Sequence, residues 1–316
     1  MTRVAVVGSV NLDLTVAVSH LPDPGETVLG SDVSFRPGGK GGNQAVAARR
    51  MGADTVLFAA VGADRFGTDL RTALQAEGLP ATGLTTIDGV ATGLAMIVVE
   101  GTGENTIVVA PGANELLDGQ PLTAQLPPLL APGTVLLLQL EIPIATCLGA
   151  ARLARSAGAT VLLNAAPLPK VMDPVFAELL TAVDVLVVNE GEAWHLSGEQ
   201  GDPPRDDAGW QRLAAGLTDL GPQVCVVTLG GDGAVLAGPG KALACAGFAV
   251  PVVDTTGAGD AFCGALAVSL AQGLALGEAL RRSCAVGALA TTRMGAQAAL
   301  PTVDEVDGFL ARDGRA

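Results

Sequence analysis

The stretch D-T-T-G-A-G-D-A-F-C-G, from Asp254 to Gly264, predicts a glycine turn that opens a helix. It follows β-branched residues typical of a strand, Val250, Val252 and Val253, and it runs into an apolar helical pattern from Ala261 to Leu270. A strand, a tight turn and a helix in succession are the building block of α/β folds. The stretch therefore indicates that at least this part of the chain is α/β.

The turn also offers a site for an anion, because a helix N-terminus presents unpaired backbone N–H groups and a partial positive charge. We expect Gly257, Ala258 and Gly259 to supply those groups. Asp260 would repel a resting phosphate, but it is useful if it removes a proton from a hydroxyl that attacks the phosphate. Alternatively, Asp260 only favours the positive end of the helix and Gly264 only permits close packing. A short glycine motif does not decide between these interpretations.

The composition predicts a protein with a large buried core. The chain has 316 residues, of which 49% are hydrophobic, and this length allows one large or two ordinary domains. Its formal net charge is −14, and basic residues cluster no further than pairs such as Arg49-Arg50. This balance argues against binding to nucleic acid or to an anionic membrane. An anionic small substrate would need local dipoles or a metal ion to hold it.

The cysteines indicate a reducing, cytoplasmic environment. The chain has 5 of them, widely spaced and without a C-x-x-C pattern, as expected of reduced and mostly buried thiols. The first residues form a strand pattern rather than a secretion signal. Pro127, Pro128 and Pro132 interrupt the long uncharged window Pro121–Leu140 and rule it out as a membrane span.

Strand and helix patterns alternate along most of the chain. Buried-strand patterns cover Val4–Val7, Thr55–Val61, Val135–Leu140, Thr160–Asn164, Val183–Val188 and Val224–Val227. Helical patterns cover Asn43–Met51, Thr68–Glu77, Ile144–Ser156, Pro174–Leu180, Asp207–Leu220, Leu276–Thr291 and Val303–Leu310. Such alternation with short connections predicts a doubly wound, mostly parallel sheet with helices on both faces.

Two segments depart from this alternation. Strand patterns at Thr15–Val18 and Thr27–Phe35, and again at Gly93–Val99 and Thr106–Val109, have no helix between them. We interpret them as one small β-sheet that forms a lid. The predicted division is therefore a lid of residues 15–36 and 91–110, and a core of residues 1–14, 37–90 and 111–316.

Polar or glycine residues follow the predicted strands. They are Asn11, Asp13, Glu141, Asn189, Glu192, Thr228, Gly230 and Asp260. Each one alone is compatible with ordinary turn chemistry, because Asn and Asp often bond their own backbone in loops. Together they favour a ligand site, because sheets of this class bind ligands at the carboxyl edge of their strands.

A second glycine loop, R-P-G-G-K-G-G-N-Q-A from Arg36 to Ala45, precedes a predicted helix. Its glycines let the backbone approach a ligand, while Lys40 and Asn43 supply hydrogen-bond donors. It is not a Walker A loop, since Lys40 is followed by glycine and not by serine or threonine. A flexible surface turn is the alternative, but a simple turn seldom needs so many glycines.

The two loops, G-G-K-G-G-N-Q-A at Gly38–Ala45 and D-T-T-G-A-G-D-A-F at Asp254–Phe262, resemble the signatures of the ribokinase-like carbohydrate kinases. The similarity continues through V-N-L-D, L-Q-L-E, N-E-G-E and G-A-Q, and so covers nearly the whole chain. Within the family, Lys40 with Asn43, P-G-A-N before Glu115, and the Asn11–Asp13 pair favour D-ribose as the sugar.

The resemblance implies a role for each matching position, with Asp260 as the catalytic base and Gly257, Ala258 and Gly259 as the anion hole. The sugar would be held by Asn11, Asp13, Gly39, Lys40, Asn43, Glu141 and Asp260. The nucleotide would be held by Asn189, Thr228, Gly230, Gly233, Gly259 and Cys284, with Glu192 acting indirectly on Mg²⁺. A potassium ion would map onto Asp254, Thr256, Ala290, Gly295 and Ala299.

Two of these positions depart from the family pattern. Ala299 stands where members often have a serine ligand to potassium, and Cys284 stands where a polar contact to adenine is common. The implied activity is in-line phosphoryl transfer from ATP to D-ribose, giving D-ribose 5-phosphate, with Mg²⁺ and K⁺ as cofactors and a homodimer formed through the lid. The alternatives are a kinase for another pentose or a ribosyl nucleoside, and a non-catalytic relative that binds sugar or nucleotide.

Overall fold

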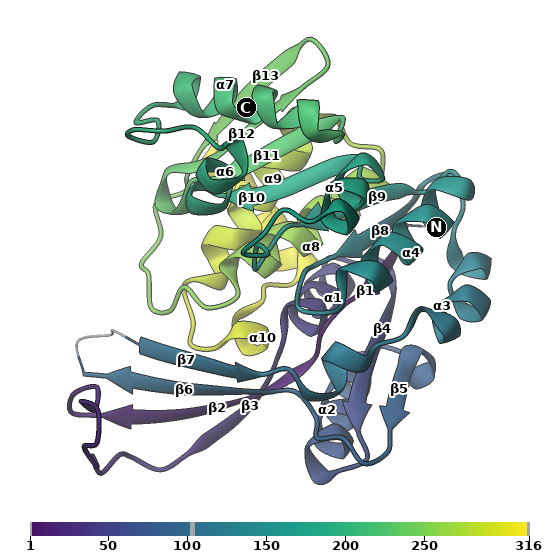
Figure 1. The fold of residues 1–316 in the computed structure, drawn as a ribbon. Coiled ribbons are helices and arrows are strands. Elements are labelled where there is room, and N and C mark those ends of the chain that lie inside the picture. Colours follow the sequence, from purple (N-terminus) through teal and green to yellow (C-terminus); the bar gives the residue numbers. More distant parts are fainter. Residues whose placement is uncertain (1, 102–104, 315–316) are drawn as a thin grey trace.

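A computed structural model describes residues 2–101 and 105–314, which form a large α/β body and a small sheet that projects from it (Figure 1). Within this part of the chain, nine strands form the main sheet in the order β13-β12-β11-β10-β9-β8-β1-β4-β5. They are β1 (Arg3–Val7), β4 (Asp54–Gly62), β5 (Leu84–Ile87), β8 (Thr134–Leu138), β9 (Thr160–Asn164), β10 (Val185–Asn189), β11 (Val224–Thr228), β12 (Gly233–Gly238) and β13 (Lys241–Ala246). Neighbours from β5 to β11 are parallel, and β12 and β13 pair antiparallel, which confirms the predicted mostly parallel sheet.

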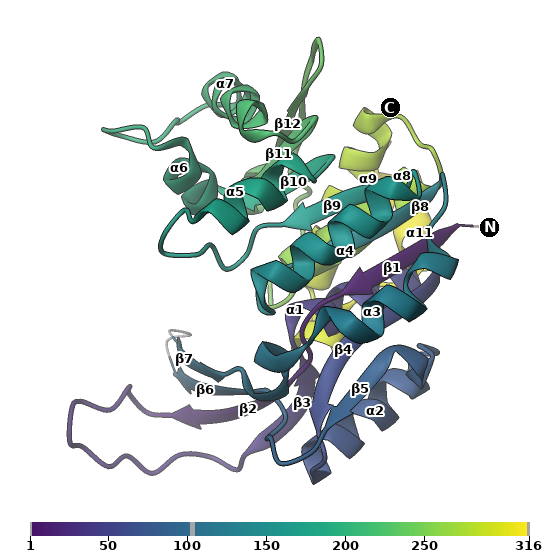
Figure 2. The same cartoon turned by 45° about the vertical axis from the view of Figure 1, so that its right-hand side comes forward.

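Helices cover both faces of the main sheet (Figure 2). One face carries α1 (Lys40–Arg50), α2 (Arg65–Ala76), α8 (Ala258–Ala271), α9 (Leu276–Ala290) and α11 (Val303–Asp313). The other carries α3 (Gly119–Gln125), α4 (Ile144–Ser156), α5 (Pro174–Thr181), α6 (Glu190–Ser197) and α7 (Asp207–Leu217). This arrangement is the doubly wound architecture that the alternation predicts.

Strand β1 shows why the fold needs both helix layers. Val4 and Val6 pack into the hydrophobic cluster on the α1 and α8 side, whereas Ala5 and Val7 pack into the cluster on the α4 side. All of these side chains are fully buried. Successive side chains of a strand point to opposite faces, so an uninterrupted apolar run is stable only where both faces are covered.

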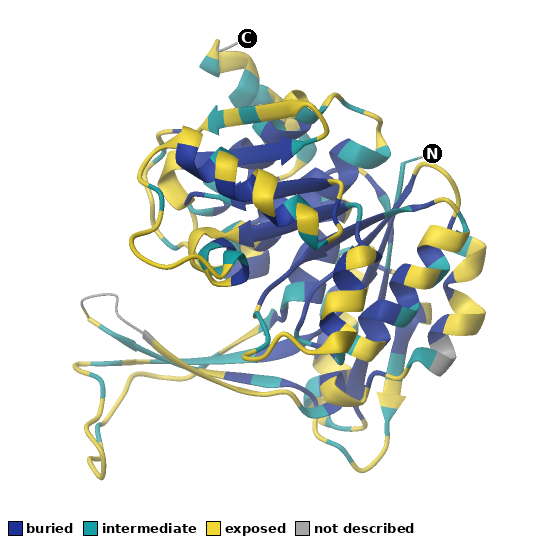
Figure 3. Cartoon of the chain, turned by 45° about the horizontal axis from the view of Figure 1, so that its top comes forward, coloured by how far each residue is buried: buried dark blue, intermediate teal, exposed yellow. Residues whose placement is uncertain are grey.

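The small sheet has the strand order β3-β2-β6-β7 within the described residues. Its strands are β2 (Asn11–Val18), β3 (Ser34–Gly38), β6 (Leu94–Glu100) and β7 (Asn105–Ala110). Figure 3 shows that it extends beyond the body and is mostly exposed or half-buried. The pairing of β2 with β6 is parallel, while the other pairs are antiparallel. Between the strand patterns Gly93–Val99 and Thr106–Val109 the sequence also predicts a turn, Gly101-Thr102-Gly103, which lies partly outside the described residues.

Several predicted boundaries are wrong, and each error has a physical reason. Residues 27–33 are not a strand, because the continuous pairing with β2 covers only Ser34–Gly38, although Ser31 N–H donates to the Ala17 carbonyl at 2.8 Å. Val250, Val252 and Val253 are likewise outside any strand, and the last two side chains are exposed. Helix α1 begins at Lys40, earlier than predicted. Helices α3 and α6 and the short edge strand β5 were not predicted.

No helix within the described residues is long and apolar enough to cross a membrane. The window Pro121–Leu140 instead contains most of α3, a short helical turn at Pro127–Leu129 and strand β8. The prolines therefore have the effect expected from the sequence, since they divide the window into short elements.

Candidate active site

The N-terminus of α8 places Asp260 against α1. Gly257 precedes the helix with φ 77°, a left-handed conformation that favours glycine. Ala258 N–H, one of the predicted anion-hole groups, donates to the Thr255 carbonyl at 3.2 Å. A Cβ on Gly264 would lie 2.6 Å from the Ala47 Cβ, so this glycine allows α8 to approach α1 closely. Asp260, in the first turn of α8, is 7% exposed as a result.

Two side-chain amides of α1 hold the Asp260 carboxylate. Asn43 Nδ2 donates to Oδ2 at 2.9 Å, and Gln44 Nε2 donates to Oδ1 at 2.9 Å. Burial raises the pKa of Asp260, while the Lys40 charge and both amides act in the opposite direction. The amides favour the ionised carboxylate, the form that can accept a proton.

Two further carboxylates, Glu141 and Asp13, lie near Asp260, and Asp13 comes from the small sheet. Glu141, just after β8, accepts a 2.5 Å hydrogen bond from Ser9 Oγ and a 3.0 Å hydrogen bond from the Lys40 backbone N–H. Asp13 lies in β2, and burial, together with the negative charges of Glu141 and Asp260, raises its pKa to about 7. The pKa of Lys40 is also raised. Burial lowers it, but the neighbouring carboxylates, Asp260 first, raise it overall.

The glycines of the first loop make room for this cluster. A Cβ on Gly38 would lie 2.2 Å from Asp13 Oδ2, and a Cβ on Gly39 would lie 2.7 Å from the Asn11 backbone nitrogen. Asn11 is itself fixed, because its Oδ1 accepts a 2.8 Å hydrogen bond from Asn114 Nδ2. The loop therefore needs glycine for close approach, as the sequence predicts.

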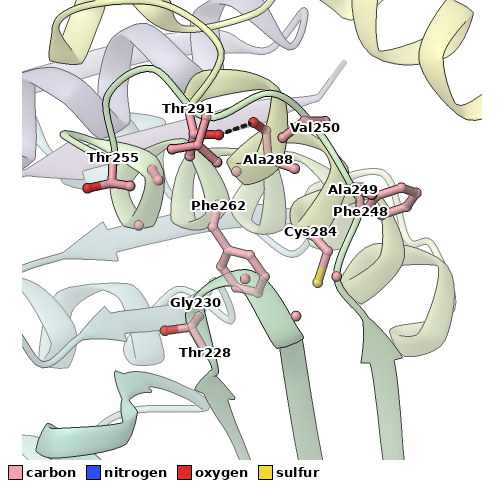
Figure 4. Close-up of a pocket in the computed structure, with 17 residues that line it drawn as sticks. Thr228, Gly230, Phe248, Ala249, Val250, Thr255, Phe262, Cys284, Ala288 and Thr291 are labelled. Carbon is pink, nitrogen blue, oxygen red and sulfur yellow. Dashed lines mark hydrogen bonds between the residues drawn. The ribbon is translucent and has the colours of Figure 1, made fainter.

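Two cavities lie along the carboxyl edge of the sheet, and Asp260 lines the smaller of them. The smaller, of about 140 Å³, is lined by Lys40, Asp260 and other polar side chains, namely Asn164, Asn189, Glu192 and Thr228. The larger, of about 520 Å³, lies between β12 and α9 and has a mostly apolar wall that includes Phe248, Phe262 and Cys284 (Figure 4). Thr228 and Gly259 line both cavities, which therefore meet beside the N-terminus of α8.

Asn189 and Glu192 form a capping box at the start of α6. Asn189 Oδ1 accepts a 2.8 Å hydrogen bond from the Glu192 backbone N–H, and Glu192 Oε2 accepts one of 2.8 Å from the Asn189 backbone N–H. Burial is the first cause of the raised pKa of Glu192. Both residues thus have a structural role in addition to lining the smaller cavity.

The residues present fit a magnesium ion that is held chiefly by a nucleotide. Among the described residues, no group of His, Cys, Asp and Glu side chains has the arrangement of a protein-only metal site. Mg²⁺ commonly keeps several waters and binds one or two carboxylates together with substrate phosphates. The Glu192 carboxylate on the wall of the smaller cavity matches that requirement.

The residues expected at a potassium ion are brought together only in part. Asp254 Oδ1 accepts hydrogen bonds from Thr256 N–H at 2.9 Å and Thr256 Oγ1 at 2.6 Å. Its Oδ2 accepts a 2.7 Å hydrogen bond from Gly295 N–H. Ala290 and Ala299 are fully buried, and the methyl side chain of Ala299 offers no oxygen ligand. Asp254 therefore joins its own loop to the loop of Gly295. A potassium ion at this place would receive no side-chain oxygen ligand from Ala299.

Most of the predicted site residues are brought to one region, but not always from the predicted kind of element. Asn11 and Asp13 were expected in the loop after a strand. They lie instead in β2, which begins at Asn11 and belongs to the small sheet. Sequence reasoning gave no individual role to five polar residues of this region. Ser9, Gln44 and Asn114 hold Glu141, Asp260 and Asn11, while Gln139 and Asn164 bond to Gln44. Gln44, Asn114 and Gln139 stand inside the quoted motifs, and Ser9 and Asn164 stand near strand ends.

An α/β body, a projecting sheet, and a buried carboxylate where a polar and an apolar cavity meet are features of a sugar kinase that also binds a nucleotide. The family profile described as pfkB family carbohydrate kinase matches residues 1–303. The chain therefore belongs to this family and is a carbohydrate kinase.

Two relatives and one solved structure are similar to the chain over almost their entire length. A ribokinase of Haemophilus influenzae is 36% identical, with 96% of this chain and 97% of that protein covered. A deoxyribokinase of Salmonella typhimurium is 30% identical, with 98% of each covered. The solved structure of Arabidopsis thaliana ribokinase complexed with ribose and ATP is 30% identical and superposes with a TM-score of 0.87, covering 98% of each chain.

Proposed function

We propose that this protein transfers the γ-phosphoryl group of ATP to the 5-hydroxyl of D-ribose and forms D-ribose 5-phosphate and ADP. The observation that carries the proposal is the position of Asp260, which separates a cluster of sugar-binding residue types from the cavity that extends to Cys284. The ribokinase relatives and the ribose and ATP complex of one of them support the choice of substrates.

The sugar is proposed to bind on the lid side of Asp260. Carboxylates accept hydrogen bonds from hydroxyl groups, and Asp13 and Glu141 are half-buried there. Asn11, Gly39, Lys40 and Asn43 complete the set expected to surround the sugar. Each carboxylate oxygen of Asp260 accepts one hydrogen bond, from Asn43 or from Gln44. Both oxygens therefore keep a lone pair that can accept a hydrogen bond from a sugar hydroxyl.

The nucleotide is proposed to occupy the larger cavity, with its phosphates toward Gly259. The mostly apolar wall near Phe248 and Cys284 suits a base, while Thr228, Gly230 and Gly233 lie near the sheet edge. Asn189 lines the smaller cavity, on the path between the nucleotide and the sugar. In this arrangement the γ-phosphoryl group would lie near Asp260.

In the proposed reaction the sugar oxygen forms a new bond to the γ-phosphorus as the bond to the β–γ bridging oxygen breaks. Asp260 takes the hydroxyl proton as the new bond forms. Lys40 and the N-terminus of α8 lie where positive charge offsets the charge of the phosphoryl oxygens. A bound Mg²⁺ would neutralise charge on the nucleotide phosphates, with Glu192 nearby.

A coupled assay of ADP release tests this function. We expect release to require a sugar and to be fastest with D-ribose in a panel with 2-deoxy-D-ribose, other pentoses, D-fructose and adenosine. The deoxyribokinase relative makes 2-deoxy-D-ribose the second candidate. A stronger response to any other sugar or to adenosine would replace D-ribose as the substrate, and release that no member of the panel stimulates would contradict the proposal.

The small sheet is proposed to act as a lid formed by residues 15–36 and 91–110, with the remainder as the core. Asp13 lies in β2 and Glu141 in the body, so a sugar between them contacts both parts. Water at the reacting phosphorus would compete with the sugar, and a lid that closes over the sugar excludes it. Limited proteolysis slowed by D-ribose would support the lid, and unchanged cleavage at saturating sugar would contradict it.

The same sheet is proposed to mediate a homodimer. Its apolar side chains Phe35, Ile107 and Val108 are 54%, 52% and 54% exposed. Exposed apolar strands readily pair with a second copy. Light scattering should give twice the monomer mass, and an Ile107→Lys variant should shift the protein toward monomer. A monomer at all concentrations would contradict the dimer.

Two finer properties complete the proposal. The cysteines, which form no disulfide within the described residues, support a cytoplasmic location. Potassium is proposed to bind near Asp254, Thr256 and Gly295. Ala290 lies at the end of α9 beside this site, and Ala299 would contribute no side-chain ligand. Comparing rates in K⁺ and in Na⁺ buffers measures the dependence, and equal rates would remove potassium from the cofactors.

A further inference from the structure

A buried chain of side-chain amides leads from the main sheet to Asp260. Gln139 Nε2 donates to Gln44 Oε1 at 2.7 Å, and Gln44 Nε2 donates to both Asp260 Oδ1 at 2.9 Å and Asn164 Oδ1 at 3.1 Å. Gln44 and Gln139 are fully buried. Both N–H groups and the carbonyl of the Gln44 side chain thus have partners, although the residue is not on the wall of either cavity.

The chain of bonds has only one workable direction. If the side-chain amide of Gln44 were flipped by 180°, its carbonyl oxygen would face the Asp260 carboxylate, and its N–H groups would face the N–H groups of Gln139. The orientation of the Asn164 amide is fixed as well. Its Nδ2 donates to the Val187 carbonyl at 3.4 Å, which leaves its Oδ1 to accept the hydrogen bond from Gln44. A buried polar group that faces a like group costs far more than a neutral contact, so each amide fixes the orientation of the next.

The backbone makes room for this chain at a specific point. Gln139 directly follows β8, and a Cβ on Gly8 would lie 1.8 Å from Gln139 Oε1. Gly8 directly follows β1, the neighbouring strand, so the two strand ends admit the amide between them. Within the described residues Gln139 Oε1 accepts no hydrogen bond, so the donation to Gln44 Oε1 is the hydrogen bond that this buried side chain makes.

We propose that Gln44 is a positioning residue for the catalytic carboxylate of Asp260, and that Gln139 fixes the Gln44 amide in the orientation that allows it to act. This inference rests on the proposed function, in which Asp260 takes the proton of the sugar hydroxyl. Gln44 holds one carboxylate oxygen so that the carboxylate cannot rotate, and it supports the ionised form. Asn43 holds the other oxygen but lies where the sugar binds, so the roles of the two amides differ.

The charged groups that face Asp260 come from several elements, and each affects its titration. Lys40 of α1 favours the ionised form, whereas the negative charges of Glu141, after β8, and Asp13, in β2, oppose it. Burial opposes ionisation most strongly. Without the Gln44 donor this balance shifts toward the protonated acid, so turnover should require a higher pH.

The test replaces each amide with methionine, which has a similar shape but no N–H donor. In Gln44→Met we expect kcat at pH 8 to fall roughly 10- to 100-fold, the effect of a lost hydrogen bond to a charged group. The acid limb of the kcat–pH profile should move to higher pH, while KM for D-ribose changes less than about threefold, because Gln44 does not touch the sugar. Gln139→Met should show a smaller change in the same direction.

The double variant separates positioning from packing. Because Gln139 acts through Gln44, the variant with both changes should be no slower than Gln44→Met alone, whereas independent effects would multiply. Gln223→Met is a matched control, since Gln223 also donates to an aspartate, Asp184 Oδ1 at 3.1 Å, but at the exposed surface. It should leave kcat and its pH profile unchanged.

The outcomes distinguish this inference from the proposed function. If Asp260→Asn abolishes turnover but Gln44→Met keeps both the normal kcat and the normal acid limb, the positioning role is wrong and the function stands. If Asp260→Asn retains turnover, the base assignment itself is wrong. Multiplicative losses in the double variant, or a rise in KM without a loss of kcat, would also overturn the positioning role. Thermal unfolding of each variant verifies that the compared proteins are folded.

Discussion

Asn43 and Asp260 are 217 positions apart in the chain, yet Asn43 Nδ2 donates to Asp260 Oδ2 at 2.9 Å. The two residues belong to the two glycine loops, which begin the adjacent helices α1 and α8. This hydrogen bond joins the proposed sugar side of the site to the proposed phosphate side. A change at either residue should therefore affect chemistry more than folding.

Replacing Asp260 with asparagine should lower kcat by roughly 10² to 10⁴, the usual range for loss of a general base. The fold should remain, because asparagine keeps the shape and burial raises the pKa of Asp260, which shows that its charge is costly in the folded protein. Steady-state kinetics and thermal unfolding measure both effects. Asp88→Asn, at an exposed position, serves as the control. Turnover near that of the control would contradict the assignment of Asp260.

The raised pKa of Asp13, about 7, predicts a pH dependence of sugar use. Only the carboxylate form accepts a sugar hydroxyl with both oxygens, so kcat/KM for D-ribose should fall as pH decreases through 7, approaching tenfold per unit. Stability should change in the opposite sense. Asp13 binds a proton more tightly in the folded protein than in the unfolded chain, so its contribution is fully present below pH about 4 and is lost as pH rises through 7.

An Asp13→Asn variant tests the same group. It should be more resistant to thermal unfolding than the parent at pH 8 without sugar, and it should bind D-ribose much more weakly. The acid limb near pH 7 should disappear from its residual kcat/KM profile. A limb that persists at the same pH would assign the titration to another group.

The sequence predicts elements well where the pattern is local. The predicted bounds Ile144–Ser156 and Thr160–Asn164 are those of α4 and β9, because each is a uniform apolar pattern and a glycine turn separates them. At the start of α11, Thr302 and Glu305 form the capping box that their spacing in the sequence predicts. In these cases the residues that determine the structure are neighbours in the sequence.

Prediction fails where partners are distant. The β-branched residues Val252 and Val253 have strand propensity but no strand beside them, and pairing rather than propensity makes a strand. Gln44 and Gln139 are 95 positions apart, so one sequence does not show that their side chains meet. The glycine loops indicated the site, whereas the amides that support it became visible only in three dimensions.

Substituting Gly38 with alanine should displace Asp13, because the new Cβ would lie 2.2 Å from Asp13 Oδ2. We expect KM for D-ribose to rise at least about tenfold, equivalent to about 1.4 kcal/mol, with a smaller effect on KM for ATP. Gly149→Ala is the matched control. It lies in α4 with no atom within 4 Å of a new Cβ, so alanine should stabilise the helix slightly. Equal effects of the two changes on the sugar would contradict the steric argument.

Asn189 has two possible roles, and serine at this position separates them. Its Oδ1 caps α6 by accepting from the Glu192 N–H at 2.8 Å, and the residue also lines the smaller cavity. Serine is as good an N-cap as asparagine, so Asn189→Ser should change the free energy of unfolding by less than about 0.5 kcal/mol, whereas Asn189→Ala should cost about 1 kcal/mol. Because serine lacks the amide N–H groups, KM for ATP should rise severalfold in both variants. Thr302→Ser, in the capping box of α11, controls for the cap exchange alone. If Asn189→Ser leaves KM for ATP at the parent value while Asn189→Ala destabilises the protein, Asn189 is a helix cap that does not contact the nucleotide.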